Sequence, residues 1–223
     1  MTVILVLLMF GTLIAIDYIR NRNKAPQTAV ATVPRVATGV SLGDFVEGFH
    51  VPENLRYHPG HGWAMRERSR LARVGVDEFG AALLGTVDRV ELPKPGHWVR
   101  QGQKAWSFYR NGAIAEMVSP VEGEVVEVNE EVMKDPSLLR KDPFGKGWLM
   151  AVHVPDEESV QHNFLPVYLV KDWIRQSAER LFARQPQLAG PVMADGGHPI
   201  ESLTAGLPGS SWKELTKGFF LSE

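Results

Sequence analysis

The amino-acid sequence predicts a mainly β domain, a small sandwich or barrel, in the middle of the chain. Two observations predict it: short segments in which apolar and polar residues alternate, and tight-turn signals between those segments. The alternating segments are residues 71–76, 86–92, 104–109, 113–118 and 124–128.

Composition agrees with a globular domain and excludes several classes of protein. The chain has 223 residues, a formal net charge of -2, 44% hydrophobic residues and no cysteine. Without cysteine there is no disulfide framework, no zinc-thiolate site and no thiol nucleophile. The small net charge gives no general attraction for nucleic acid.

The elements follow from local patterns. Residues 77–84 are expected to form a short helix with Phe79, Leu83 and Leu84 on one side. The strand over residues 86–92 ends at Pro93, which cannot continue a central strand. Asn111-Gly112 lies between two alternating segments and is the strongest short hairpin signal.

The N-terminal segment predicts a membrane anchor. Residues 2–16 carry no charge, and a helix over residues 2–19 would be roughly 27 Å long, just enough to cross a bilayer. The basic residues Arg20, Arg22 and Lys24 follow it, so the N-terminus is expected outside and the main domain in the cytoplasm. A short secretory signal peptide is the alternative, although the basic region before the apolar stretch is missing. We therefore expect an anchor over residues 1–19 and a linker over residues 20–52, in which a short strand could form.

The middle of the chain resembles the H protein of the glycine cleavage system, a relative of lipoyl and biotinyl carrier domains. Five blocks carry the resemblance in the same order and with matching spacing, and together they are specific. They are Tyr57-His-Pro-Gly-His-Gly-Trp63, Val74-Gly-Val-Asp-Glu-Phe79, Leu84 to Gly96 with Val90-Glu-Leu-Pro93, Ser119-Pro-Val-Glu-Gly-Glu-Val-Val-Glu-Val-Asn129 and Asp142-Pro-Phe-Gly-Lys-Gly-Trp-Leu149. The resemblance implies a lipoyl-type barrel-sandwich hybrid over residues 53–155.

The family's chemistry requires a lysine that this sequence lacks at the expected place. Family members carry lipoic acid as an amide on a lysine at the tip of a β-hairpin, eight residues before the proline of the next block. Counting back from Pro120 gives Gly112, which offers no amine, and Tyr109 replaces the motif glutamate. Gly62 replaces another family glutamate, near the groove that receives the loaded arm. The hairpin is therefore expected to persist without lipoate.

Other candidate chemistry is weak. Lys104 is the nearest lysine on the same hairpin but is expected at its base, and Lys134, Lys141 and Lys146 fall in loops of the family pattern. The spacing of His58 and His61 could serve a metal, yet a structural role is favoured because no nearby cysteine completes a ligand set. No catalytic motif for hydrolysis or phosphate binding is present, so we expect no enzyme activity.

The C-terminal third is expected to be helical at two places. Residues 156–184 predict a helix packed on the domain, with Val170, Trp173, Ile174, Leu181 and Phe182 on one stripe. Residues 185–223 predict an extended tail ending in a short helix capped by Ser211. The apolar residues of that helix either fold back on the barrel or dock a partner.

These observations predict a non-catalytic, membrane-anchored module that is not lipoylated and acts through an unidentified protein partner. The alternative is a carrier or accessory subunit of the glycine cleavage system, with glycine cleavage subunits as partners. No cofactor, metal or nucleic-acid partner is expected. The candidate interaction residues are Tyr109, Arg110, Asn111, Gly112, Trp212, Phe219 and Phe220.

Overall fold

The computed structural model describes residues 43–155, 163–184, 203–204 and 208–222. The predicted anchor over residues 1–19, most of the predicted linker and most of the predicted extended tail lie outside these residues. Within the described ranges, no helix combines the length and the apolar character needed to cross a membrane.

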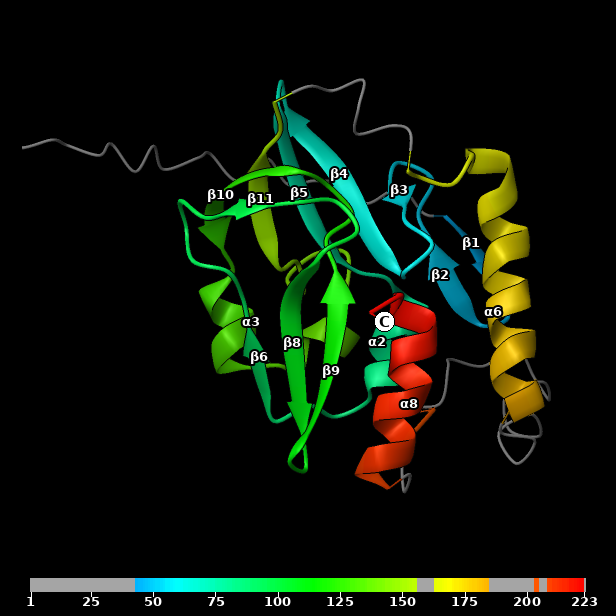
Figure 1. The fold of residues 1–223 in the computed structure, drawn as a ribbon. Helices are drawn as coiled ribbons and strands as arrows, with labels where there is room; N and C mark the ends of the chain where they lie inside the picture. The colour runs from blue at the N-terminus through cyan, green and yellow to red at the C-terminus, as the bar shows by residue number, and fades with distance from the viewer. Residues whose placement is uncertain (1–42, 156–162, 185–202, 205–207, 223) are drawn as a thin grey trace, which may run out of the picture. The chain divides into compact units, whose positions relative to one another are not determined.

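The described strands form two sheets and a separate hairpin (Figure 1). The six-stranded sheet is ordered β3 (Arg56–Tyr57), β4 (Gly62–Arg68), β5 (Leu71–Val76), β11 (Met150–His153), β10 (Gly123–Val128) and β7 (Trp98–Val99). The three-stranded sheet is ordered β6 (Arg89–Glu91), β8 (Lys104–Arg110) and β9 (Ala113–Val118). The prediction of a mainly β domain is confirmed, and the segments predicted at 71–76 and 113–118 match β5 and β9.

Helices join and cover the sheets. They are α2 (Glu78–Leu84), α3 (Glu130–Lys134), α4 (Leu138–Lys141), the 3-10 helix η1 (Val167–Leu169), α6 (Val170–Arg184) and α8 (Gly209–Phe220). The Asp77 side chain caps α2 by accepting a hydrogen bond from the Gly80 N–H, which satisfies a backbone donor in the first turn. The predicted helix at residues 77–84 is therefore confirmed.

A single hydrophobic core links both sheets with α2, α6 and α8. Trp63 of β4 is fully buried, and its indole N–H donates to the carbonyl oxygens of Val76 at 3.0 Å and Pro143 at 3.2 Å. A Cβ at Gly75 would lie 2.6 Å from the Trp63 ring, so glycine is required for the ring to cross β5.

The predicted linker boundary at residue 52 needs correction. Strands β1 (Asp44–Val46) and β2 (Phe49–Val51) form a hairpin, with Val46, Phe49 and Val51 buried in the core. Glu47 and Gly48 both have positive φ, as a two-residue hairpin turn requires. The folded part thus begins before the expected boundary, because these apolar side chains pack on it.

The C-terminal helices differ in detail from the prediction. Helix α6 begins at Val170, after η1, and buries Val170, Ile174 and Leu181, while Trp173 and Phe182 are partly buried against the core. Helix α8 begins at Gly209, two residues before the predicted cap. The predicted Ser211 cap is wrong, because the helix starts after Pro208 without a side-chain capping hydrogen bond.

Candidate functional site

The β8–β9 hairpin ends in a two-residue turn formed by Asn111 and Gly112. Arg110 pairs with Ala113 across the hairpin, and φ is 48° at Asn111 and 78° at Gly112. Two positive φ values define the turn geometry that Asn-Gly favours, so the predicted hairpin is confirmed. The Asn111 N–H donates to the Asp88 carboxylate at 2.7 Å, which holds the turn against the start of β6.

Gly112 faces open space. A Cβ built at this position would have no atom within 4 Å apart from its own chain neighbours. A side chain here would therefore project into solvent, where another protein could reach it. Glycine leaves this exposed position with backbone only.

Tyr109 lies on the outer face of the same hairpin, between two charged residues of β6. Its hydroxyl donates to the Glu91 carboxylate at 2.5 Å, and the Arg89 guanidinium lies 3.9 Å from the ring centroid. The hydrogen bond to Glu91 raises the pKa of Tyr109, so the phenol stays protonated and donates. Arg89 and Glu91 were missed as site residues, although the alternation over residues 86–92 already predicts that they face solvent.

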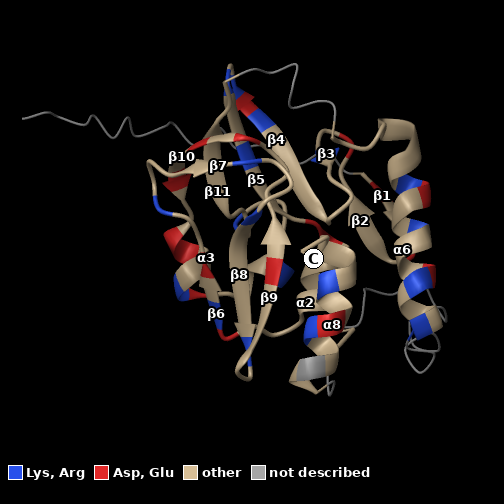
Figure 2. Cartoon of the chain, viewed as in Figure 1, with Lys and Arg blue, Asp and Glu red and all other residues tan. Residues whose placement is uncertain are grey.

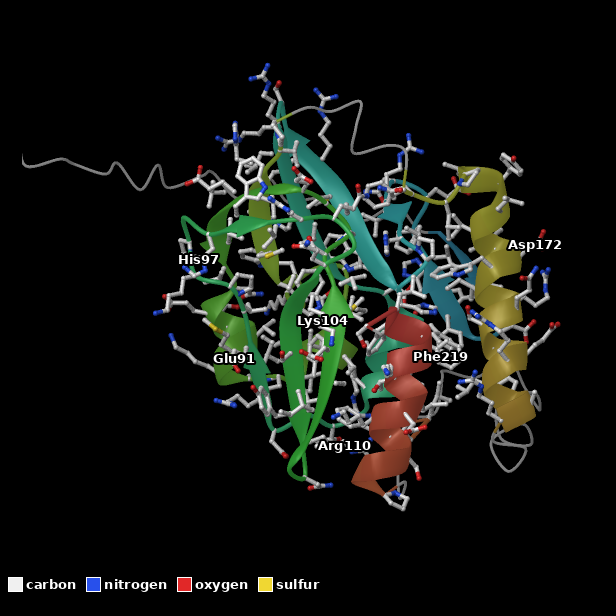
Figure 3. All side chains as sticks on the ribbon, viewed as in Figure 1. Glu91, His97, Lys104, Arg110, Asp172 and Phe219 are labelled. Carbon is white, nitrogen blue, oxygen red and sulfur yellow. The ribbon has the colours of Figure 1, made fainter. Side chains whose placement is uncertain are left out.

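Arg110 is not available to a partner, which corrects the prediction. Only 9% of the residue is exposed, and its guanidinium donates to Thr204 Oγ1 at 2.6 Å and to the Thr204 carbonyl at 2.7 Å. The guanidinium also lies 5.5 Å from the centroid of the Trp212 ring, and burial lowers its pKa. Arg110 points inward because it alternates with Tyr109 along β8 (Figure 3).

The predicted docking role of Trp212, Phe219 and Phe220 is also wrong, because all three side chains are buried. The Trp212 indole N–H donates to the carbonyl oxygens of Leu83 and Leu84, which end α2. The Phe219 ring packs 5.4 Å from the Phe79 ring. The alternative that the terminal helix folds back on the domain is confirmed.

The β8–β9 hairpin has no lysine near its tip. Lys104 pairs with Val118 at the far end, and its ammonium group donates to the Glu116 carboxylate at 2.7 Å. The next lysine in the sequence is Lys134, whose ammonium group lies 3.3 Å from the Glu130 carboxylate in α3. The placement of Lys104 at the base of the hairpin is as expected.

The two candidate metal ligands are built into the interior. His61 is fully buried between the rings of Phe79 and Trp173, with Nδ1 2.9 Å from Asp77 Oδ2. His58 Nδ1 accepts a hydrogen bond from the Gly60 N–H at 3.1 Å, and burial lowers the pKa of His58 to about 4. In the described part of the chain, no group of three or more histidine, aspartate and glutamate side chains is placed to hold a metal ion.

Comparison with known proteins assigns the family. Residues 55–167 match the family model of the glycine cleavage H-protein. The glycine cleavage system H protein of Streptomyces coelicolor is 39% identical over 106 residues, which cover 48% of this chain and 85% of the relative. The corresponding protein of Bifidobacterium longum is 37% identical over 108 residues, which cover 48% of this chain and 78% of the relative. A solved H protein from Mycobacterium marinum aligns at 24% identity and a TM-score of 0.49, over 57% of this chain and 99% of that chain.

The mainly β fold and the match over residues 55–167 together define the class of protein to which this chain belongs. The chain is a member of the glycine cleavage H-protein family. The matched region ends at residue 167, so α6 and α8, which pack on the domain, lie outside it.

Proposed function

We propose that this chain is a non-catalytic member of the H-protein family that carries no lipoate and acts by binding proteins. In this proposal Gly112 occupies the place of the lipoyl lysine, and residues 53–155 keep the lipoyl-type barrel-sandwich hybrid. Family membership supports a role beside the glycine cleavage subunits.

The hairpin tip is the observation that carries the proposal. The turn geometry and the spacing to Pro120 are those expected for the attachment hairpin, and the tip is open to solvent. An amide to lipoic acid needs an amine at the tip, and Gly112 has none. Lys104 is a poor substitute because it lies at the opposite end of the hairpin and is ion-paired with Glu116.

The location of the protein is part of the proposal. Residues 2–19 would form a single-pass anchor, with the main domain on the cytoplasmic side, as hydropathy and the following basic residues favour. Alkaline carbonate extraction of source membranes tests the anchor: we expect the full chain to stay in the pellet. Its release into the supernatant would refute an integral anchor.

The intact mass of the chain purified from its own source tests the absence of lipoate. We expect the mass of the polypeptide without a lipoyl group. As a control, the Streptomyces coelicolor H protein expressed in the same cells should show whether lipoylation is active. A lipoyl adduct on this chain would refute the proposal.

A carrier or accessory subunit of the glycine cleavage system is the second candidate, and the names of the relatives favour it. A carrier must show the adduct in the same mass spectrum, whereas an accessory subunit need not. Gentle detergent capture of the tagged full chain separates the remaining cases. Enrichment of glycine decarboxylase, aminomethyltransferase or lipoamide dehydrogenase would support the accessory role, and their absence would favour an unrelated partner.

A further inference from the structure

Strands β7 and β10 expose two large apolar side chains away from the hairpin tip. Trp98 is 53% exposed and Val126 46%. Trp98 is in β7, the edge strand of the six-stranded sheet, and pairs directly with Glu124 of β10. His97, labelled in Figure 3, precedes Trp98 and marks this flank of the molecule. A half-exposed tryptophan on a sheet edge is the kind of side chain that anchors protein interfaces.

Negative charge surrounds these apolar side chains. Residues 122–135 contain six carboxylates and one lysine. Figure 2 shows the acidic residues over β10 and α3. The six carboxylates are Glu122, Glu124, Glu127, Glu130, Glu131 and Asp135, and all six residues are exposed.

The local cations neutralise only part of this charge. Lys134 is engaged by Glu130 within α3, and Lys94 and Arg100 flank β7. Glu122, Glu124 and Glu127 form no ion pair with any residue that the structure describes. A bulge in β10 between Val125 and Glu127 lets both Val126 and Glu127 face solvent. The negative charges of Glu122, Glu124 and Glu127 are therefore available to a partner beside the exposed apolar side chains.

We propose that the surface formed by Trp98, Val126 and the carboxylates of Glu122, Glu124 and Glu127 binds a basic segment of a partner protein, in which lysine or arginine residues flank an apolar side chain. The apolar side chain would contact Trp98 and Val126, and the flanking cations would lie against Glu122, Glu124 and Glu127. Charge complementarity selects this occupant, because an anionic lipid surface or a nucleic acid would be repelled. The proposal rests on the proposed function, a module that binds proteins, and assigns the binding surface to a different sheet from the hairpin.

Peptide binding to the full chain in a non-ionic detergent tests the surface. The probes are two labelled seven-residue peptides, Lys-Lys-Leu-Lys-Leu-Lys-Lys and the same peptide with serine in place of leucine, and binding to empty micelles is subtracted. Variant E122Q/E124Q/E127Q should bind the leucine peptide about tenfold more weakly than the wild type. The matched control E53Q/E179Q/E214Q removes the same charge from other exposed positions and should change affinity less than about twofold.

The apolar part of the surface is tested separately. Trp98→Ala should weaken binding of the leucine peptide about threefold or more and leave unfolding of the chain unchanged, because Trp98 is half exposed. The serine peptide should bind more weakly than the leucine peptide. Equal losses in the two triple variants, equal affinity for the two peptides, or full affinity in Trp98→Ala would each overturn the proposal. A lipoyl adduct in the mass spectrum would refute the proposed function without changing these binding results.

Discussion

Tyr109 and Arg110 are neighbours at the end of β8, but they lie in opposite environments. Tyr109 faces solvent between Arg89 and Glu91, whereas Arg110 is buried against Thr204 and Trp212. The buried side is completed by residues from the C-terminal segment, outside the region matched by the family model. The C-terminal segment therefore supports the inner side of the hairpin, while the tip stays open.

The largest expected effect on the free energy of unfolding comes from removing the Trp212 side chain, which packs against Arg110 and the end of α2. Trp212→Ala should lower the free energy of unfolding by about 4 kcal/mol, because it empties a fully buried site and removes the indole donor to the end of α2. Denaturant unfolding of the full chain in mild detergent measures this. Tyr109→Ala, on the solvent side, should lower the free energy of unfolding far less, because the ring contacts only exposed charged side chains. Similar losses in both variants would contradict the difference between the two sides.

The free energy of unfolding should also depend on pH, because His58 is a buried titratable residue near the end of α8. His58 lies beside Gly60, where a Cβ would be 3.1 Å from the carbonyl oxygen of Phe220 in α8. Burial lowers the pKa of His58 from 6.5 to about 4, so between these values the unfolded chain binds more protons than the folded chain. The contribution of His58 is complete above pH 6.5 and is lost as the pH falls toward 4, by up to about 3 kcal/mol.

The variant His58→Asn keeps an acceptor for the Gly60 N–H but does not titrate. Unfolding free energies at pH 7 and pH 4.5 should differ less in this variant than in the wild type. An identical pH dependence in both proteins would show that His58 is not the titrating group.

A smaller effect is expected at Arg110. Arg110→Met keeps much of the side-chain volume but leaves the oxygens of Thr204 without their donors, which should cost about 2 kcal/mol. Arg89→Met removes an exposed cation from the other side and should cost less than about 1 kcal/mol. If Arg89→Met lowers the free energy of unfolding more than Arg110→Met does, Arg110 is not on the buried side of the hairpin.

The smallest effect is expected at the tip. Gly112→Lys should cost about 1 kcal/mol, because φ is positive but nothing obstructs the side chain. Gly96→Lys is a matched control, since Gly96 also has a positive φ and open surroundings. Thermal unfolding measures the loss of stability in both variants. A much larger loss for Gly112→Lys than for Gly96→Lys would show that the tip is not open.

The sequence predicts those elements whose signals are local. Alternation and the Asn-Gly turn are enough for β5, β8, β9 and the hairpin tip. Strand β4 was not predicted, because it begins with buried Gly62 to Met65 and then turns polar, without alternation. Strand β11 is a short run buried at Met150 to Val152, which periodicity alone does not separate from a helix.

The candidate site was predicted in part for the same reason. The open turn at Asn111 and Gly112 follows from two residues, whereas the burial of Arg110 depends on Thr204, 94 positions away. Alternation along β8 does place Arg110 on the side of Trp106 and Phe108, but its charge favours an exposed reading. The burial of Trp212 likewise depends on the end of α2, which no local pattern of α8 encodes.

We propose that this member of the H-protein family keeps the hairpin to which lipoate is attached in the family but lacks the lysine that would carry it. Mass spectrometry of the native chain, as the intact protein and as peptides covering Lys104 to Glu131, tests it most directly. We expect an unmodified intact mass and an unmodified Lys104, while a lipoylated H protein from the same cells shows the adduct. A lipoyl group on Lys104, or on any other lysine of the chain, would contradict it.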